Sequence, residues 1–217
     1  GIKTLATVEE IMREFIALGA DRKTFIIGIG GGIVSDITGF AASIFMRGLD
    51  FGFVSTTLLA QVDASVGGKN GVNIDRLKNM AGVFCQPRFV ICDHSMLATL
   101  SEDEYRNGMA ELIKTACLDT TGLFDFVWQH REELRNRDAS AVEEAVFRCA
   151  AFKASVVTQD ERETGLRRIL NLGHTLGHAI EKVKGIKHGF AISAGMGFAL
   201  DISIRNGLIS AGESDEI

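Results

Sequence analysis

Three of the chain's five histidines lie within fifteen residues of one another, and imidazole both binds metals and carries protons near neutral pH. His174 and His178 are four residues apart, so both face one side of a helix, and His188 follows ten residues later. A carboxylate such as that of Glu111 would complete a His/Glu metal site of the open, catalytic kind. Spacing alone favours His174 and His178 as the metal-binding pair. The alternatives are two helix-face histidines with ordinary hydrogen bonds, and for Glu111 a helix salt bridge to Lys114, three residues later.

Three consecutive glycines indicate a turn that a phosphate can approach. Gly30, Gly31 and Gly32 follow an apolar run and precede a helical pattern, which places their backbone at the N-terminal end of a helix dipole. The turn favours a nucleotide, although it is not a full GxGxxG motif because Ile33 occupies the last glycine position. A simple tight turn is the alternative, and Asp36 at the head of the next helix is open to an interpretation as a capping carboxylate.

A second anion-binding segment is predicted between residues 56 and 70, which are rich in hydroxyls and glycines. Backbone amides next to Gly67 and Gly68 can point at an oxyanion while Lys69 supplies the charge. Lys78 and Asn79 add a second cation and an amide. A solvated surface loop is the alternative.

These residues require a βαβ unit followed by helices. Helical spacing of apolar residues alternates with short apolar runs, and the run before the three glycines is typical of a strand buried on both faces of a parallel sheet. We expect helices over 7–18 and 35–46 and strands over 24–29, 51–54 and 89–92. After residue 93 strand signals stop and successive helices are predicted to about residue 207, so we place a domain boundary near 93, between an α/β part (1–93) and a helical part (94–217).

Composition and charge exclude several classes of protein. The formal net charge of -5 argues against a nucleic-acid or anionic-membrane partner, and 46% hydrophobic with 24% charged residues is typical of a soluble globular protein. The longest uncharged apolar stretch, 189–200, is shorter than the roughly 20 residues of a membrane helix, so we expect a core helix there. No secretory signal is visible at the start, and we expect a cytoplasmic protein. The cysteines form no CxxC pair and are expected to be buried thiols: Cys85, Cys92, Cys117 and Cys149.

Taken in order, the motifs of the chain resemble those of the 3-dehydroquinate synthase family, in the sugar-phosphate cyclase superfamily. The resemblance runs from residue 4 to residue 210, and several motifs in the right order are far more specific than any one of them. The motifs that carry it span 30–36, 45–48, 56–63, 67–69, 108–114, 160–163, 171–178 and 188–189. The resemblance implies an N-terminal Rossmann-like parallel-sheet domain that binds NAD, followed by an all-α metal and substrate domain. The family extends further at both ends, so we expect the chain to be part of a longer protein.

The resemblance also implies roles for individual residues. It assigns Zn²⁺, with Co²⁺ as a possible substitute, to Glu111, His174 and His188, and makes His178 a site residue and a candidate proton relay, which replaces the expectation from spacing. It assigns NAD to Gly30, Gly31, Gly32, Asp36, Thr56, Thr57, Asp63, Lys69 and Lys78. It places around the substrate Asp63, Lys69, Asn79, Lys114, Lys153, Arg167 and Asn171, and it makes Arg47 a contribution to the neighbouring site of a homodimer.

The implied reaction is a phosphate elimination of the shikimate pathway, which leads to chorismate and the aromatic amino acids. 3-Deoxy-D-arabino-heptulosonate 7-phosphate loses phosphate and closes to 3-dehydroquinate, while NAD oxidises a hydroxyl and later returns the hydride. Two kinds of alternative remain. The first is a related sugar-phosphate cyclase or a metal-dependent polyol dehydrogenase, and the second is a non-catalytic fragment that binds NAD or metal.

Overall fold

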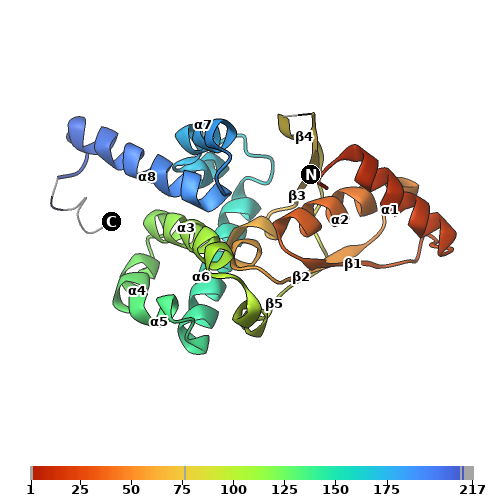
Figure 1. Cartoon of the computed structure of the whole chain (residues 1–217), viewed down its shortest axis with the longest axis horizontal. Coiled ribbons are helices and arrows are strands. Elements are labelled where there is room, and N and C mark those ends of the chain that lie inside the picture. The colour runs from red at the N-terminus through yellow and green to blue at the C-terminus, as the bar shows by residue number, and fades with distance from the viewer. Residues whose placement is uncertain (1, 76, 211, 213–217) are drawn as a thin grey trace. The chain divides into compact units, whose positions relative to one another are not determined.

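The computed structural model describes residues 2–75, 77–210 and 212. The chain divides into two compact units, Gly1–Thr99 and Leu100–Ile217, and each has its own set of packed elements (Figure 1).

The first unit is built on a three-stranded parallel sheet of β1 (Ile26–Gly30), β2 (Phe51–Ser55) and β5 (Val90–Cys92), in the order β1-β2-β5. The register pairs Ile26 with Phe51 and Gly30 with Ser55. Helix α2 (Gly32–Ile44) connects β1 to β2, and this confirms the predicted βαβ unit. Helix α1 (Leu5–Ala17) packs on α2, and in Figure 1 both helices lie along one side of the strands.

Within the described residues, the helices of the first unit cover one face of the first strand, whereas the sequence pattern predicted cover on both faces. Ile27 and Ile29 are 53% and 63% exposed, and Ile91 on β5 is 49% exposed. Alternate residues of a strand point to opposite faces, and the helices of this unit cover one face. Phe51 and Phe53 pack on that covered face against Ala42 of α2.

A β-hairpin begins at the end of the predicted anion-binding segment 56–70 and contains Lys69, Lys78 and Asn79. Strands β3 (Lys69–Ile74) and β4 (Leu77–Phe84) pair in antiparallel fashion, and η2 (Ala60–Ala64), a short π-helix, precedes them. Gly71 and Gly82 allow the strands to approach closely, since a Cβ at Gly71 would lie 2.6 Å from the carbonyl oxygen of Ala81. The hairpin lacks the regular apolar alternation by which strands are recognised in a sequence. The first unit is completed by the short helices η1 (Phe45–Arg47) and η3 (His94–Thr99).

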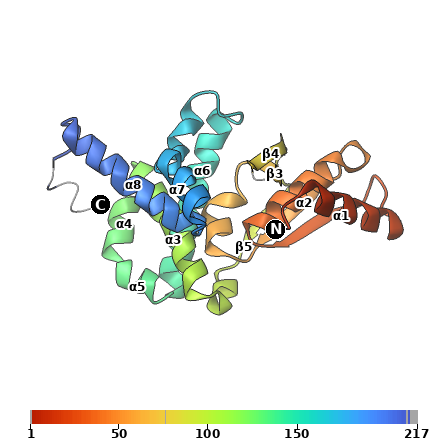
Figure 2. The ribbon, with the colours of Figure 1, turned by 45° about the horizontal axis from the view of Figure 1, so that its top comes forward.

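The second unit is helical throughout its described residues, as predicted. Its helices are α3 (Glu102–Leu118), α4 (Leu123–Gln129), α5 (Arg131–Arg135), α6 (Ala139–Gln159), η4 (Leu166–Asn171), α7 (His174–Lys184) and α8 (His188–Arg205). Helices α7 and α8 lie side by side, and α8 also contacts α3 (Figures 1 and 2). The apolar stretch 189–200 lies within α8, and among the described residues no helix is long and apolar enough to span a membrane.

Tyr105, the single tyrosine of the chain, joins α3 to α5. It is 2% exposed, its hydroxyl donates to the carbonyl oxygen of Leu134 at 2.6 Å, and the guanidinium of Arg137 lies 4.5 Å from the ring centroid. Burial raises the pKa of Tyr105 to about 12.

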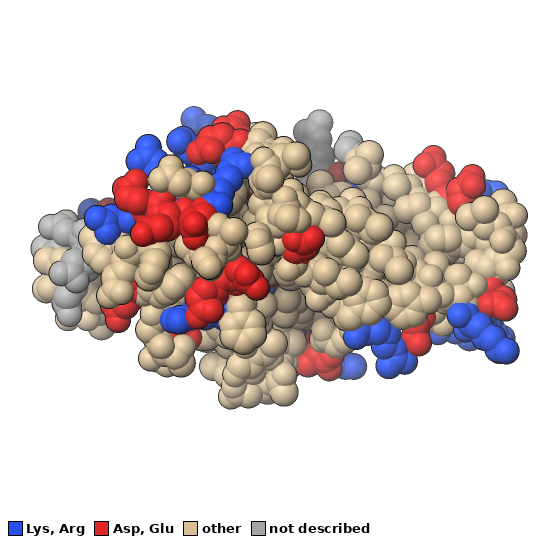
Figure 3. Space-filling model, turned by 90° about the horizontal axis from the view of Figure 1, so that it is seen from below, with Lys and Arg blue, Asp and Glu red and all other residues tan. Residues whose placement is uncertain are grey.

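The expectation of four buried thiols holds for Cys149, whereas Cys85, Cys92 and Cys117 are partly exposed. On the face shown in Figure 3, acidic and basic side chains are interspersed, and neither sign forms a continuous stripe over the described residues.

Candidate functional site: a carboxylate with two imidazoles, and a glycine turn

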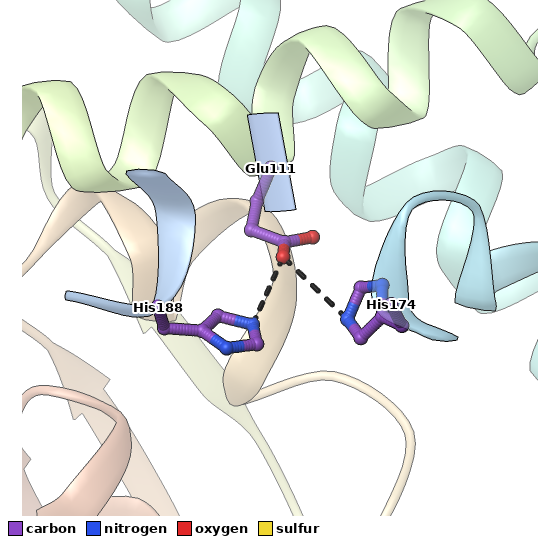
Figure 4. Close-up of side chains that lie close together, drawn as sticks. All are labelled: Glu111, His174 and His188. Atoms are coloured by element: carbon purple, nitrogen blue, oxygen red, sulfur yellow. Dashed lines mark hydrogen bonds and ion pairs between the residues drawn. The ribbon is translucent and has the colours of Figure 1, made fainter. Parts of the chain in front are cut away.

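Glu111, His174 and His188 come together from α3, α7 and α8, and both imidazoles point toward the carboxylate (Figure 4). Oε1 of Glu111 lies 3.1 Å from Nε2 of His188 and 3.7 Å from Nε2 of His174. The Glu111 side chain is fully buried, while those of His174 and His188 are 14% and 27% exposed. Each residue offers one ligand atom, and these atoms all lie within 4.8 Å of one another. Two imidazole nitrogens and one carboxylate oxygen are the three-ligand donor set of an open zinc site.

His178 lies beside this cluster. Its ring centroid is 5.1 Å from that of His174 and 5.8 Å from that of His188, and the residue is exposed. With Glu181 and His188 it forms a second group whose ligand atoms lie within 4.8 Å of one another. The pair expected from spacing is therefore close in space, but the buried carboxylate Oε1 faces His174 and His188.

A contact between Gly189 and Asn107 places His188 opposite Glu111. The Gly189 N–H donates to Oδ1 of Asn107 at 2.6 Å, and a Cβ at Gly189 would lie 2.0 Å from the Asn107 carbonyl oxygen. The first turn of α8 thus packs directly on the backbone of α3. Glu111 is one turn along α3 from Asn107, so His188 is held next to it.

A second glycine contact places His174. A Cβ at Gly195 of α8 would lie 1.9 Å from the carbonyl oxygen of Gly173, the residue before His174. Gly173 caps the N-terminus of α7 in a left-handed conformation, with φ of 75°. Glycine adopts this conformation without steric cost. Both histidines are consequently positioned by close backbone packing against α8 or α3.

Glu111 also forms a buried ion pair with Lys114. Nζ of Lys114 lies 2.5 Å from Oε2 of Glu111, and the side chains are 2% and 0% exposed. Glu111 can therefore be both a metal ligand and an ion-pair partner, because Oε1 faces the two imidazoles and Oε2 faces Lys114. The pair is buried, unlike the surface helix pair that the spacing also allowed.

The two histidines respond differently to this environment. Burial lowers the pKa of His174, and the nearby Glu111 carboxylate offsets this only in part. Burial also acts to lower the pKa of His188, but hydrogen bonds and attraction from Glu111 and Glu181 outweigh it, so the pKa of His188 is raised.

Three further predicted residues lie in the same unit. Lys153 on α6 is 8% exposed and Arg167 in η4 is 2% exposed, so both cations are buried. Asn171 ends η4 and donates from Nδ2 to Oε1 of Glu163 at 2.7 Å.

A carboxylate at the end of α6 shapes the turn that carries Arg167. Asp160 accepts backbone N–H hydrogen bonds from Thr164 at 2.9 Å, Gly165 at 2.8 Å and Arg167 at 3.0 Å. These hydrogen bonds hold the pKa of Asp160 well below its usual range. The guanidinium of Arg167 in turn donates to the carbonyl oxygen of Glu161.

In the first unit, the glycine turn connects β1 to α2 and contacts the segment that follows β2. Gly30 ends β1, Gly31 is the N-cap of α2 and Gly32 is its first residue. A Cβ at Gly31 would lie 2.9 Å from the Thr57 side chain, and the Thr56 N–H donates to the Gly30 carbonyl at 2.9 Å. The structure thus brings the turn together with Thr56 and Thr57, at the N-terminal end of a 13-residue helix.

Asp36 does not cap α2, so that alternative is wrong. It lies beyond the first turn of α2, no side chain caps the helix, and its carboxylate forms an ion pair with Lys3. The Lys3 ammonium also donates to Oδ1 of Asn79, so one lysine links two residues that the sequence analysis assigned separately.

The other predicted residues of this unit lie on three elements. Asp63 is in η2, Lys69 begins β3, and Lys78 and Asn79 lie on β4. Arg47 is an exposed residue of η1 with a left-handed φ of 72°.

Sequence reasoning missed Lys3, Asn107 and Glu181. Asn107 stands four residues before Glu111, and Glu181 stands three residues after His178, so helical spacing could have found both. Lys3 carries no comparable signal, because its partners are 33 and 76 residues away.

The fold is shared with solved cyclases. A 2-epi-5-epi-valiolone synthase from Streptomyces hygroscopicus subsp. jinggangensis 5008, solved with NAD⁺ and Zn²⁺, aligns with a TM-score of 0.92 at 29% identity over 99% of this chain and 61% of that one. A 2-deoxy-scyllo-inosose synthase, complexed with carbaglucose-6-phosphate, NAD⁺ and Co²⁺, aligns with a TM-score of 0.92 at 34% identity over 98% and 60%. The chain therefore has the fold of the sugar-phosphate cyclases, an α/β part followed by a helical part, as the sequence predicted.

Within that class, the chain belongs to the 3-dehydroquinate synthase family. The family's N-terminal domain matches residues 1–107 and its C-terminal domain matches residues 108–217. The 3-dehydroquinate synthase of Geotalea uraniireducens is 44% identical over 218 residues, which cover 99% of this chain and 61% of the relative. That of Halorhodospira halophila is 48% identical over 208 residues, which cover 94% and 59%. The resemblance drawn from the motifs is confirmed, and the chain spans about three fifths of the length of these relatives.

Proposed function

We propose that the chain carries the NAD, metal and substrate groups of a 3-dehydroquinate synthase, a carbon-oxygen lyase that converts 3-deoxy-D-arabino-heptulosonate 7-phosphate to 3-dehydroquinate and phosphate. The observation that carries the proposal is the cluster of Glu111, His174 and His188, with the buried Lys114 beside it, in a member of this family.

Glu111 Oε1, His174 Nε2 and His188 Nε2 would hold Zn²⁺, with Co²⁺ as a substitute. The donor set fits, and the two similar cyclases carry Zn²⁺ and Co²⁺. The ion would supply Lewis acidity toward the hydroxyl that is oxidised. Glu111 is suited to bind the ion through Oε1, because its side chain is fully buried and Oε2 forms an ion pair with Lys114.

Gly30, Gly31 and Gly32 would receive the pyrophosphate of NAD, because they present backbone at the N-terminal end of α2. NAD would supply a reversible hydride acceptor. Further groups assigned to the cofactor are Asp36, Thr56, Thr57, Asp63, Lys69 and Lys78. The Lys3 bridge between Asp36 and Asn79 supports the arrangement, because it orders one side chain on α2 and one on the hairpin.

Buried cations of the second unit would bind the anionic substrate. Lys153 and Arg167 lie in low-dielectric surroundings where attraction to a carboxylate or phosphate is strong. Asn171 would hydrogen-bond hydroxyl groups of the substrate. The other residues assigned to the substrate are Asp63, Lys69, Asn79 and Lys114. His178 is exposed and adjacent to the cluster, so it is suited to move a proton near neutral pH.

We further propose that the protein works in the cytoplasm as a homodimer, with Arg47 serving the neighbouring subunit. The exposed position of Arg47 supports this role, since its side chain is accessible to a second chain.

The test is release of inorganic phosphate from 3-deoxy-D-arabino-heptulosonate 7-phosphate, with and without NAD and a chelator. We expect release that needs NAD, stops on chelation and leaves no net NADH. His174→Ala should lose both zinc and turnover, whereas His130→Ala, which changes a histidine outside the cluster, should retain them.

The other outcomes identify the alternatives. Net NADH from a polyol would indicate a metal-dependent dehydrogenase, and release from a different sugar phosphate alone would indicate another cyclase. NAD and zinc binding without turnover would make the chain a binding fragment. Full activity of His174→Ala with zinc still bound would refute the metal assignment.

A further inference from the structure

Both imidazoles of the candidate metal centre have a hydrogen-bond acceptor at the nitrogen that faces away from Glu111. Nδ1 of His174 lies 3.0 Å from the carbonyl oxygen of Leu172, and Nδ1 of His188 lies 3.3 Å from Oε2 of Glu181. A carbonyl and a carboxylate oxygen accept hydrogen bonds, so each ring can donate its Nδ1–H to that acceptor. In both residues Nε2 faces Oε1 of Glu111, which also accepts hydrogen bonds. An ion bound at Nε2 would take the place of a proton there and leave Nδ1–H on the ring.

The acceptor of His188 is a side chain that the sequence analysis did not single out. Glu181 lies on α7, seven residues after His174, so two helical turns bring it to the same helix face. Its side chain is only 11% exposed, which removes most competition from water for the hydrogen bond. Glu181 therefore connects α7 to the first residue of α8.

We propose that Glu181 is a positioning residue of the metal centre, which accepts the Nδ1–H of His188 and so fixes the tautomer and the ring orientation that aim Nε2 at the ion. This inference rests on the proposed function, because it requires that Glu111, His174 and His188 hold the metal. Carboxylates that accept a hydrogen bond from a ligating histidine typically raise metal affinity by about 10- to 100-fold.

The geometry distinguishes this role from that of a fourth protein ligand. Glu181 approaches His188 from its Nδ1 side, whereas Glu111 approaches from its Nε2 side. An ion bound by His178, Glu181 and His188 would use a more exposed set of side chains and would leave the fully buried Glu111 outside the coordination shell.

The experiment measures the zinc dissociation constant of the full chain by competition with a chromophoric chelator. The variants are Glu181→Ala, Glu181→Gln, His178→Ala and His174→Ala, with Glu132→Ala on the exposed face of α5 as a matched control. We expect Glu181→Ala to bind zinc about 10- to 100-fold more weakly, and Glu181→Gln to fall between it and the unmodified chain, because the amide oxygen still accepts a hydrogen bond. His178→Ala and Glu132→Ala should bind normally.

A second readout is NMR of the imidazole Nδ1–H protons in the zinc-bound chain, where the ion occupies Nε2. We expect the His188 Nδ1–H to give a hydrogen-bonded, slowly exchanging signal in the unmodified chain and in Glu181→Gln, and to shift and exchange faster with water in Glu181→Ala. The His174 Nδ1–H signal is the internal control, and circular dichroism confirms that each variant is folded.

Three results would overturn the proposal. Zinc affinity of Glu181→Ala within a factor of two of the unmodified chain, with the same His188 Nδ1–H signal, would show that Glu181 does not orient His188. Loss as complete as in His174→Ala, accompanied by loss in His178→Ala, would make Glu181 a ligand. An unmodified chain that binds no zinc would overturn both the proposed metal centre and the role of Glu181. Normal zinc binding in Glu181→Ala would overturn only the role of Glu181.

Discussion

Replacing Gly189 with alanine tests whether close backbone packing positions the metal centre. The added Cβ would lie 2.0 Å from the Asn107 carbonyl oxygen, which belongs to the α3 backbone and cannot rotate away. The first turn of α8 must therefore move by about 1 Å, because protein interiors have few voids to absorb the methyl group. Zinc ligands tolerate displacements of only about 0.2 Å, so His188 would leave its position opposite Glu111.

The magnitude follows from the cost of forcing an extra methyl group into a packed interface, about 1–3 kcal/mol. If the metal-free protein relieves the contact by moving α8, zinc must draw the helix back, and the whole cost opposes binding. At about 1.4 kcal/mol per factor of ten, the zinc dissociation constant should rise about 5- to 150-fold.

Gly197→Ala on the same helix is the matched control. A Cβ at Gly197 meets nothing within 4 Å, so the substitution should leave zinc affinity unchanged and stabilise the helix by about 0.5–1 kcal/mol. The assays are a chelator-competition titration and thermal unfolding with and without a chelator. Gly189→Ala that bound zinc as tightly as Gly197→Ala would refute the positioning argument.

Three further outcomes are expected. Lys114→Met removes the cation beside the buried carboxylate of Glu111 and should destabilise the metal-free protein by about 3–5 kcal/mol. Zinc should then raise the melting temperature of the variant more than that of the unmodified chain. Equal zinc-induced shifts in the two proteins would contradict this. Tyr105 should titrate near pH 12, whereas an unfolded tyrosine titrates near pH 10, so the stability of the fold should fall as the pH rises from 10 to 12. Tyrosinate absorbance measures the titration of Tyr105 directly, because the chain has one tyrosine. Titration near pH 10 would refute the prediction. Asp160→Ala should loosen the turn that holds Arg167 and lower the free energy of unfolding at pH values above the ordinary carboxyl pKa. The difference in stability between the variant and the unmodified chain should vanish as acid protonates Asp160. A difference in stability that persists in acid would show another cause.

Local patterns predicted the helices and the parallel strands, because each depends on residues close in the sequence. The βαβ unit around 30–32 and the helices after residue 93 were found in this way. The β3–β4 hairpin was missed because its close strand approach depends on Gly71 and Gly82, which interrupt the apolar alternation. The exposure of Ile27 and Ile29 could not be read from the sequence either, since a strand does not encode how many layers cover it.

Local sequence patterns also predicted the cluster of Glu111, His174 and His188 only in part. Spacing within one helix pairs His174 with His178, four residues apart. His188 joins His174 because the chain reverses after α7 at Gly185, which has a left-handed φ of 65°, and α8 then packs on α7 and α3. Residue types alone had offered Glu111 as a possible third ligand, but family motifs, which carry such long-range information, were needed to replace His178 with His188. The functional roles of these residues stay predictions until zinc and substrate binding are measured.

The two glycine contacts of α8 have a consequence for anyone who grafts this cluster onto another scaffold. Copying only the glutamate and the two histidines into a designed three-helix bundle would fail wherever ordinary side chains keep the helix axes about 8–10 Å apart. The graft would have to include the equivalents of Gly189 and Gly195, which bring backbone against backbone at α3 and at the start of α7. In a saturation mutagenesis screen for zinc retention, these two positions should tolerate fewer substitutions than many residues that present a side chain to the site.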